Sequence, residues 1–451
     1  MTLLDKVHYV TWLPVRYVRK ILLVSGSTVA MAILALVTFL AIERSRRLTL
    51  PLPTGRFAVG RVLADWRDST HADSLAPLVG TPRELLAWIW YPAAANLRTR
   101  TEPYEPASLT AHQGVDHTPA LLRLLTRDPT KVREYSVPSP PVASDQRAYP
   151  VLVMRGGASA PVVHYSTLAE DLASHGFVVV GFDAPYRTGR VVFPDGRAFA
   201  RLPSNDPELA FGSPDSARLI NRLLDAWTSD IAFSLDRLSQ LNAADSSGRF
   251  TGRLDLSRVG VFGHSLGGIE AAQFCVVDER CKAVVDIDGA PVGRIVHDTI
   301  RRPFMFLLSD HSRANDSESQ RVLTEIRSLY DRDPVNHRHV VFIRGANHFA
   351  FSDDGALLKS GFVRLLLRLA GLLRIDGWRQ LEVTSYCLHT FFETYLQSPS
   401  PGKACPTDSP YPELQDFAPS TSDNGGRRDS AALEVRIVAA SRLPRLARRV
   451  R

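Results

Sequence analysis

An α/β fold with a mostly parallel central sheet and helices on both faces is predicted by three features of this 451-residue sequence. Short apolar runs rich in β-branched residues alternate with longer segments that have the apolar period of helices. One such run leads into Gly263-His264-Ser265-Leu266-Gly267, whose flanking glycines permit a sharp turn from a strand into a helix. The chain is also 45% hydrophobic, which is enough for one large core.

The first 50 residues are expected to form a basic segment, residues 1–20, and a transmembrane anchor, residues 21–42. Residues 21–42 carry no charge, and a helix of this length rises roughly 33 Å, which spans the hydrocarbon core of a bilayer. A cleaved signal peptide is the alternative, but the apolar run is longer than the usual signal-peptide core of roughly 7 to 15 residues. Basic residues flank both sides of the run, so the orientation in the membrane stays open.

Residues 51–398 are expected to form the catalytic α/β domain, and residues 399–451 a disordered basic tail. The domain is predicted to begin with antiparallel strands at 56–67 and 84–91, and a hairpin is predicted at 191–201. Core strands are expected at 149–154, 177–182, 258–262, 282–288, 304–309 and 340–344. Helices are expected at 168–174 and 216–241, followed by a final core helix at 357–373 and a second covering helix at 381–396.

Ser265 is the candidate nucleophile, because its motif lifts a serine hydroxyl to the edge of the sheet beside a helix N-terminus. Such a serine needs a histidine base and a carboxylate that orients the base, which follow in the order Ser, acid, His in α/β-hydrolases. His348 follows the strand expected at 340–344 and is the candidate base. The carboxyl ends of parallel strands meet at one edge, so we expect these groups to converge there.

Two carboxylates remain candidates for the acid. Asp288 ends the strand expected at 282–288, and Asp310 ends the next strand along the chain. Asp286 lies one strand period deeper and is expected to be a buried, hydrogen-bonded carboxylate. Strand spacing therefore leaves both Asp288 and Asp310 open.

The chain resembles the platelet-activating factor acetylhydrolases and their bacterial esterase relatives, within the α/β-hydrolase fold, over most of residues 51–398. Its landmarks are Pro53-Thr54-Gly55, Ile89-Trp90-Tyr91-Pro92, Tyr149-Pro150-Val151-Leu152-Val153, Leu172-Ala173-Ser174-His175-Gly176-Phe177, the Gly-His-Ser-Leu-Gly-Gly turn, Ile287-Asp288-Gly289, and Arg344-Gly345 before His348-Phe349. The resemblance implies Asp288 as the acid, because the family's acid follows the strand after the helix that Ser265 precedes. It also implies an oxyanion hole formed by the backbone amides of Leu266 and Ala158.

The anchor and the ordered Ser, Asp and His together predict a membrane-anchored serine esterase or lipase-like hydrolase that cleaves carboxylic esters and requires no metal and no organic cofactor. The resemblance implies short or oxidised acyl chains on phospholipid-like substrates. One loop departs from the family, since Met154-Arg155-Gly156-Gly157-Ala158 stands where relatives commonly have Ser-His-Gly. Arg155 is expected to pair either with a neighbouring acid or with a substrate anion. The alternatives are a dienelactone- or polyester-type hydrolase that uses Asp310, and a non-catalytic binding protein on the same fold.

The net charge of +7 is concentrated at the two ends of the chain. Residues 1–50 and residues 421–451 each carry a net +5, which leaves −3 for the rest. A mildly acidic body argues against nucleic acid as a partner, and basic ends favour contacts with a membrane surface. The sequence leaves the oligomeric state open.

The four cysteines fall into two close pairs, Cys275 with Cys281 and Cys387 with Cys405. Local disulfides would favour an oxidising compartment and hence a catalytic domain outside the cytoplasm. The alternative for Cys275 is that of a small core residue on an apolar helix face.

Overall fold

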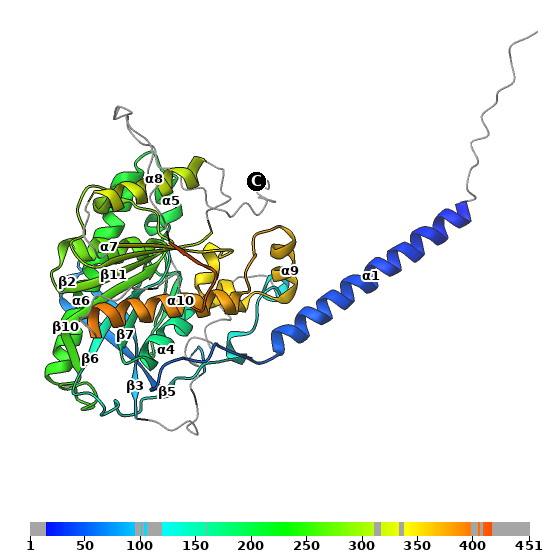
Figure 1. Cartoon of the computed structure of the whole chain (residues 1–451). Coiled ribbons are helices and arrows are strands. Elements are labelled where there is room, and N and C mark those ends of the chain that lie inside the picture. Colours follow the sequence, from blue (N-terminus) through cyan, green and yellow to red (C-terminus); the bar gives the residue numbers. More distant parts are fainter. Residues whose placement is uncertain are drawn as a thin grey trace, which may run out of the picture.

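The computed structural model describes residues 15–94, 101, 103–105, 120–158, 160–310, 317–332, 338–397, 405 and 409–416. Within these residues, helices cover both faces of a ten-stranded sheet, and one long helix projects away from the domain (Figure 1). The predicted α/β-hydrolase fold is confirmed, with parallel pairs from β7 to β13 and antiparallel pairs between β7 and β3, β3 and β2, and β13 and β14, while the edge strand β5 pairs in parallel with β2.

The strand order in the large sheet is β14-β13-β12-β11-β10-β6-β7-β3-β2-β5. Its strands are β2 (Ala58–Ala72), β3 (Pro82–Ala93), β5 (Val137–Pro138), β6 (Tyr149–Arg155), β7 (Val178–Asp183), β10 (Leu254–His264), β11 (Cys281–Ile287), β12 (Phe304–Leu308), β13 (Arg338–Ile343) and β14 (Leu414–Asp416). Two small sheets are formed by β1 (Leu48–Thr49) with β4 (Val132–Arg133), and by β8 (Arg190–Val192) with β9 (Ala198–Ala200). Every predicted core strand, the predicted antiparallel start and the predicted hairpin are therefore found.

The helices pack in two layers. One face of the sheet is covered by α6 (Ser216–Ala243), α7 (Leu266–Val277) and α8 (Ser317–Asp331), and the other by α4 (Ser166–Ser174) and α10 (Gly377–Phe392). Shorter helices are α3 (Ala120–Arg123), α5 (Pro207–Phe211) and α9 (Gly361–Leu369), with single turns at η2 (Pro129–Lys131), η3 (Val162–Tyr165), η4 (Pro203–Asn205), η5 (Gly293–Val296), η6 (His348–Phe351), η7 (Asp354–Leu358) and η8 (Glu393–Gln397).

Helix α6 is held on the sheet by the apolar face predicted from its sequence. Leu223, Trp227, Ile231 and Leu235 recur every four residues and are all buried in one core with the sheet. Each fully buried apolar side chain of this size contributes about 1.5–3 kcal/mol relative to exposure. These residues therefore fix α6 by core packing and are not open to lipid or substrate.

The predicted core helix at 357–373 is wrong. The segment instead contains η7 and α9, and no residue of α9 is buried. The core position belongs to α10, which buries eleven of its residues against α4 and the sheet. An apolar helical pattern shows that one face avoids water, but it does not say whether that face meets protein or another apolar medium.

Parts of the chain beyond the expected domain boundary at 398 also contact the domain. Strand β14 pairs with β13 and extends the sheet, with Ile343 opposite Leu414. Cys405 is tied to α10 by a disulfide with Cys387. These two contacts hold parts of the expected tail on the domain, and the rest of that tail, residues 399–404, 406–408 and 417–451, lies outside the described residues.

Both predicted disulfides are present. Cys275 of α7 is bonded to Cys281 at the start of β11, and Cys387 is bonded to Cys405, with Cα separations of 5.2 Å and 4.5 Å. All four residues are buried. Each link closes a short loop and so restricts the unfolded chain.

The projecting helix α1 (Val15–Ser45) is long and apolar enough to cross a membrane. The most apolar stretch of its part Leu22–Ser45 is not buried by the domain, whereas Leu40 and Glu43 near its end are buried. An N-terminal signal sequence would meet the same criteria of length and apolarity. The end of α1 is joined to the domain by Glu43, which accepts the backbone N–H of Gly361 and forms an ion pair with Arg127. The base of α1 therefore lies beside the start of α9 (Figure 1).

Candidate active site

The turn between β10 and α7 holds Ser265 in a backbone conformation that side chains rarely adopt, with φ 55° and ψ −124°. Glycine is required on both sides of it. A Cβ at Gly263 would lie 2.2 Å from the carbonyl oxygen of Gly267, and a Cβ at Gly267 would lie 2.5 Å from that of Gly156. A non-glycine residue in such a conformation costs about 1–3 kcal/mol, which the surrounding sheet and helix must offset.

A chain of two hydrogen bonds links Ser265, His348 and Asp288. His348 begins η6 directly after the β13 loop, and its Nε2 lies 3.1 Å from the Ser265 hydroxyl oxygen. Its Nδ1 lies 2.8 Å from Oδ2 of Asp288. The other carboxylate oxygen of Asp288 accepts the backbone N–H of Ser309 at 2.8 Å. The structure thus brings the three predicted residues together at the carboxyl ends of their strands.

The side chains joined by these two hydrogen bonds differ in how far they are buried. The side chain of Asp288 is 3% exposed, whereas that of His348 is 37% exposed. The carboxylate is therefore shielded and fixed, while the imidazole is reachable from solvent. A buried carboxylate on Nδ1 favours the tautomer in which Nε2 accepts a proton from the serine.

Asp310 lies one strand farther along the sheet. Its Oδ2 accepts the backbone N–H of Gly345 at 2.8 Å, and its own N–H donates to the carbonyl of Ala346. Asp310 therefore braces the loop that leads from β13 to His348, while Asp288 occupies the position beside the imidazole.

Asp286 is the buried, hydrogen-bonded carboxylate expected from its place in β11. Its Oδ1 accepts the backbone N–H of Gly289 at 2.8 Å, and it packs so closely that a Cβ on Gly268 would meet that oxygen at 2.0 Å. Burial raises the pKa of Asp286 to about 8, with the Gly289 N–H opposing the shift and the charge of Asp288 adding to it. The group is therefore mostly protonated at neutral pH, so one negative charge lies behind the turn instead of two.

Of the two predicted oxyanion donors, Leu266 follows Ser265 directly and Ala158 lies in the loop after β6. Leu266 is the first residue of α7, where a backbone N–H has no partner within the helix. Ala158 follows Gly157, and a Cβ on Gly157 would be only 3.2 Å from Cβ of Ser265. The loop after β6 thus touches the nucleophile candidate, as an oxyanion loop must.

The backbone strain of the chain is concentrated here. Among the described residues, six that are not glycine have a positive φ, and three of these are Ala158, Ser265 and Asp288. Strained backbone persists where the surrounding structure over-determines it, and such places are frequently functional sites.

Comparisons with known proteins agree with this geometry. The sequence profile of the family "Platelet-activating factor acetylhydrolase, isoform II" matches residues 238–397. A "Probable 1-alkyl-2-acetylglycerophosphocholine esterase" of Arthroderma benhamiae is 26% identical over 388 residues, which cover 81% of this chain and 92% of that protein. The chain is thus similar to platelet-activating factor acetylhydrolases and related esterases. The resemblance seen in the sequence is thereby confirmed.

Two further proteins are similar to this chain over different shares of its length. The "Platelet-activating factor acetylhydrolase" of Cavia porcellus is 24% identical over 279 residues, which cover 55% of this chain and 58% of that protein. A solved structure, "Ferulic acid esterase from Streptomyces cinnamoneus", matches with a TM-score of 0.65 at 23% identity and covers 82% of this chain and 99% of that one. At that identity the structural match establishes the fold alone.

The loop that departs from these acetylhydrolases has a structural explanation. Arg155 donates from Nε to Glu270 at 2.7 Å and from Nη1 to the carbonyl of Phe182 at 2.8 Å. Burial raises the pKa of Glu270 to about 7, and the charge of Arg155 opposes the shift. Of the two roles considered for Arg155, the structure shows the pairing with a neighbouring acid.

Two residues near the site were missed from the sequence. The hydroxyl of Tyr165 accepts the N–H of Gly157 at 2.9 Å and lies 2.9 Å from Nδ1 of His264. The His264 ring is buried 4.6 Å from that of His348, and burial, with the charge of His348, lowers the pKa of His264 to about 3. A neutral His264 can thus hold the oxyanion loop without adding a second positive charge. The position of His264 inside the serine motif was the available signal, whereas Tyr165 had none.

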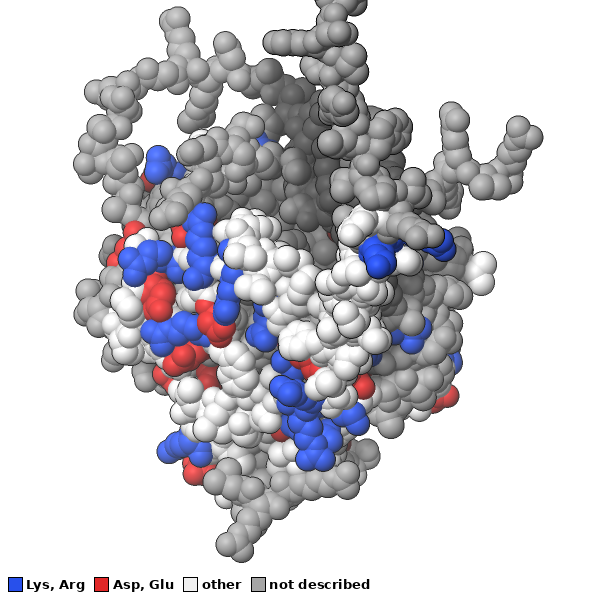
Figure 2. Space-filling view, turned by 90° about the vertical axis from the view of Figure 1, so that its right-hand side faces the viewer, with Lys and Arg blue, Asp and Glu red and all other residues white. Residues whose placement is uncertain are grey.

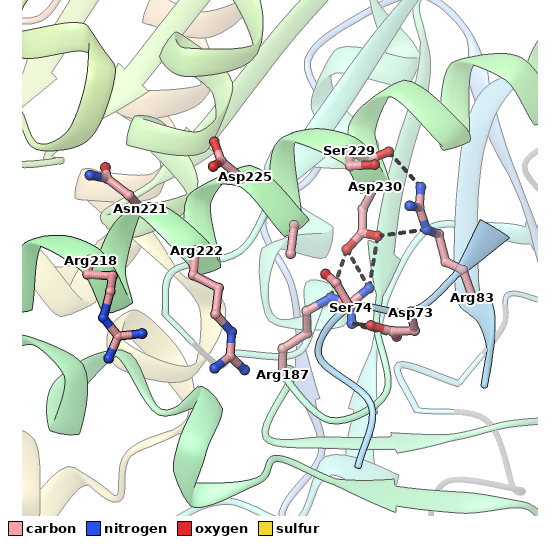
Figure 3. Close-up of a pocket in the computed structure, with 11 residues that line it drawn as sticks. Asp73, Ser74, Arg83, Arg187, Arg218, Asn221, Arg222, Asp225, Ser229 and Asp230 are labelled. Carbon is pink, nitrogen blue, oxygen red and sulfur yellow. Dashed lines mark hydrogen bonds and ion pairs between the residues drawn. The ribbon is translucent and has the colours of Figure 1, made fainter. Parts of the chain in front are cut away.

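A separate charged pocket of about 530 Å³ lies along α6 (Figure 3). At its wall Arg187 bonds Asp230 through two nitrogens at 2.8 Å and Asp73 through a third. Arg83 approaches Asp230 from the other side at 3.8 Å. Ser265, His348 and Asp288 do not line this pocket, and its buried charges neutralise one another. We interpret it as a structural ion network, in which loss of one partner costs about 3–5 kcal/mol.

Proposed function

We propose that this protein is a membrane-anchored serine hydrolase that cleaves carboxylic esters through Ser265, His348 and Asp288. The single observation that carries the proposal is the pair of hydrogen bonds that joins the three side chains, with Ser265 on a strained turn at a helix N-terminus. The names of the relatives, an alkyl-acetylglycerophosphocholine esterase and an acetylhydrolase, point to the same reaction class.

The reaction proceeds through an acyl-enzyme. His348 Nε2 takes the hydroxyl proton as the Ser265 oxygen attacks the ester carbonyl carbon, and Asp288 stabilises the imidazolium. The oxyanion is bound by the N–H groups of Leu266 and Ala158, each worth about 3 kcal/mol in a dry site. The C–O bond to the alcohol then breaks, and His348 returns its proton to the departing oxygen. Water attacks the acyl-enzyme by the same route, which releases the acid and restores Ser265.

The substrate class that we propose is an ester with a short or oxidised acyl chain on a phospholipid-like molecule. Support comes from an exposed apolar rim beside the site, which we define as Phe349, Leu365, Leu366, Leu369 and Leu372. These side chains are between 49% and 77% exposed. Exposed apolar groups in one place mark a surface that meets protein or lipid.

The apolar rim connects α1 to the active site. At one end Gly361 of α9 is bonded to Glu43 of α1, and at the other the carbonyl of Leu372 accepts the side-chain amide of Asn347, the residue before His348. The side of the molecule from which α1 leaves has an uncharged area with both basic and acidic side chains around it (Figure 2). We therefore propose that the rim meets the bilayer that α1 enters, so that esters reach Ser265 from the membrane surface.

The domain arrangement that we propose is an anchor at residues 21–42 followed by a catalytic domain that extends to β14. Two buried disulfides favour an oxidising compartment for that domain. The catalytic domain is then extracytoplasmic, on the far side of the membrane from the cytoplasm.

Hydrolysis of p-nitrophenyl acetate by the full-length protein in detergent tests the reaction. We expect turnover in the native protein and its loss in Ser265→Ala, with the same unfolding temperature. Turnover that survives in Ser265→Ala would remove Ser265 from its role, and a folded native protein inert to short and long esters alike would favour a binding protein. A series of acyl lengths on glycerophospholipid esters then defines the substrate.

The role of the rim is tested separately with Leu365→Ser/Leu369→Ser in lipid nanodiscs. Each lost leucine contact with lipid is worth about 1.5 kcal/mol, or roughly tenfold. We expect at least a tenfold loss on a phospholipid ester in the bilayer and an unchanged rate on p-nitrophenyl acetate. Leu209→Ser is the matched control, since Leu209 is 59% exposed on α5 and lies outside the rim. Equal effects of the two changes on the bilayer substrate would overturn the membrane role of the rim.

A further inference from the structure

A pocket of about 310 Å³ lies between α4 and α10, on the sheet face opposite α6 and α7. Asp171 belongs to α4, His175 follows its last residue, and His389 lies in the last turn of α10. Thr54, from the segment before β2, closes the same pocket. None of these residues takes part in the proposed hydrolysis.

Each of Asp171, His175 and His389 offers one ligand atom here, and the three atoms lie within 4.8 Å of one another. His389 Nδ1 is 2.9 Å from Oδ2 of Asp171. The two imidazole rings are stacked, with centroids 3.8 Å apart and planes 13° from parallel. The side chains of Asp171 and His389 are 4% and 11% exposed, so this is a shielded site and not a surface cluster.

The hydrogen bonds around His175 leave the lone pair of its second ring nitrogen facing the hydroxyl of Thr54, which lines the pocket. Its Nδ1 lies 2.7 Å from the carboxylate of Glu393, which fixes the proton on Nδ1 in the neutral ring. Its Nε2 faces the hydroxyl oxygen of Thr54 at 2.9 Å, and that hydroxyl also lies 2.7 Å from Oδ1 of Asp171. One hydroxyl hydrogen cannot serve two acceptors. The pocket therefore favours an added positive charge between these groups.

We propose that Asp171, His175 and His389 bind a divalent transition metal ion of the Zn²⁺ class, with water from the pocket as the fourth ligand. Two imidazoles and a carboxylate suit Zn²⁺ at about 2.0–2.2 Å. Tetrahedral ligands at that distance lie roughly 3.4 Å apart, so ligand atoms as far as 4.8 Å apart need to close in by roughly 1.4 Å. Because the two rings are stacked, one imidazole must also turn so that both lone pairs point at the ion. Glu393 on the other nitrogen of His175 is the carboxylate partner that metal-bound histidines commonly have.

The metal joins two helices that also hold the active-site loop. Gln380, near the start of α10, accepts the N–H of Asn347 and donates to its carbonyl, at 3.0 Å and 2.8 Å. Asn347 precedes His348, and the metal clamps the other end of α10 to α4. The ion is thus structural, and it stabilises the helix on which the His348 loop rests.

Titration of the untagged full-length protein, stripped with a chelator and held in detergent, tests the site with Zn²⁺ by calorimetry and with Co²⁺ by visible absorption. We expect one tightly bound ion per chain, the absorption bands of tetrahedral Co²⁺, and a higher unfolding temperature with Zn²⁺. His389→Ala and His175→Ala should each weaken binding at least about 100-fold and abolish the thermal shift. Ser265→Ala should bind the ion as the native protein does, which separates this site from the proposed hydrolysis.

His71→Ala is the matched control, because His71 also has Nδ1 2.9 Å from an aspartate oxygen, that of Asp68, but is 71% exposed. It should leave metal binding unchanged. Native protein that binds neither ion would overturn the proposal, and this result needs no variant to fold. Binding that is equally tight in the native protein and in folded His389→Ala would overturn it as well.

Discussion

Among the described residues, two His–Asp pairs of nearly the same geometry combine a histidine with a buried carboxylate, at different places in the fold. His348 Nδ1 lies 2.8 Å from Asp288, and His389 Nδ1 lies 2.9 Å from Asp171. Both carboxylates are almost completely buried, and each histidine has a second imidazole beside it. A His–Asp pair alone therefore does not define a catalytic site.

The hydroxyl beside each pair makes the difference. Ser265 projects from a strained turn at a helix N-terminus, and its oxygen faces Nε2 of His348. Thr54 lies in an extended segment, and its hydroxyl donates to the carboxylate of Asp171. Only the first arrangement lets the histidine take the hydroxyl proton, so we assign proton transfer to one pair and metal binding to the other.

Ser265→Ala and Thr54→Val compare the two hydroxyls directly, and we expect the largest difference in kcat between these two variants. Removal of the nucleophile should lower kcat on p-nitrophenyl acetate by about 10⁴- to 10⁶-fold. Thr54→Val should change kcat less than twofold, because that hydroxyl does not serve His348. Similar losses in the two variants would erase the distinction between the pairs.

Asp288→Asn and Asp310→Asn test which carboxylate orients His348. Loss of the orienting charge should lower kcat by about 10⁴-fold for Asp288→Asn. Asp310→Asn retains an oxygen that accepts the Gly345 N–H, so we expect a rate within about threefold of the native rate. A larger loss in the Asp310 variant would instead support the dienelactone- or polyester-type arrangement.

Gly157→Ala tests a feature that only the Ser265 site has, the loop after β6 that carries the proposed oxyanion donor Ala158. A Cβ there would be 3.0 Å from His264 and 3.2 Å from Cβ of Ser265, so the loop must move away. Displacement of one oxyanion donor should reduce kcat by about 10²-fold with little change in KM. An increase in KM at constant kcat would show that the loop acts in substrate binding.

The smallest effect concerns the pH dependence of stability. Asp286 has its pKa raised from 3.8 to about 8, so it stabilises the fold fully below about pH 4 and loses that contribution as the pH rises to about 8. Asp286→Asn should flatten the decline of the unfolding temperature over this window. An equally steep decline in the variant would mean that Asp286 ionises in the fold near its usual pKa.

Local sequence patterns predicted most of the fold and the site. The strands, the apolar face of α6, the serine turn, both disulfides and the meeting of Ser265, His348 and Asp288 follow from features that lie within a few residues of one another or at strand ends. The choice of Asp288 over Asp310 needed the family resemblance, because both aspartates end neighbouring strands. The structure then showed that Asp288 is the aspartate hydrogen-bonded to His348, which the strand spacing alone could not predict.

The remainder depends on contacts between distant segments. Gly157 and Tyr165 support the site through the fold of one loop, and Asp171 and His389 meet only because α4 packs on α10. The prediction for α9 failed for a related reason, because no residue of its apolar pattern is buried among the described residues. The apolar period of a sequence predicts that a helix has an apolar face. It does not predict what that face contacts in the folded protein.

Covalent labelling tests the central claim most directly. A fluorophosphonate probe is added to the folded full-length protein, and the modified peptide is identified by mass spectrometry. We predict one adduct on Ser265, blocked by a short ester substrate and strongly reduced in Asp288→Asn. Folded native protein that takes up no probe, or that carries the adduct on a different residue, would contradict the proposed role of Ser265.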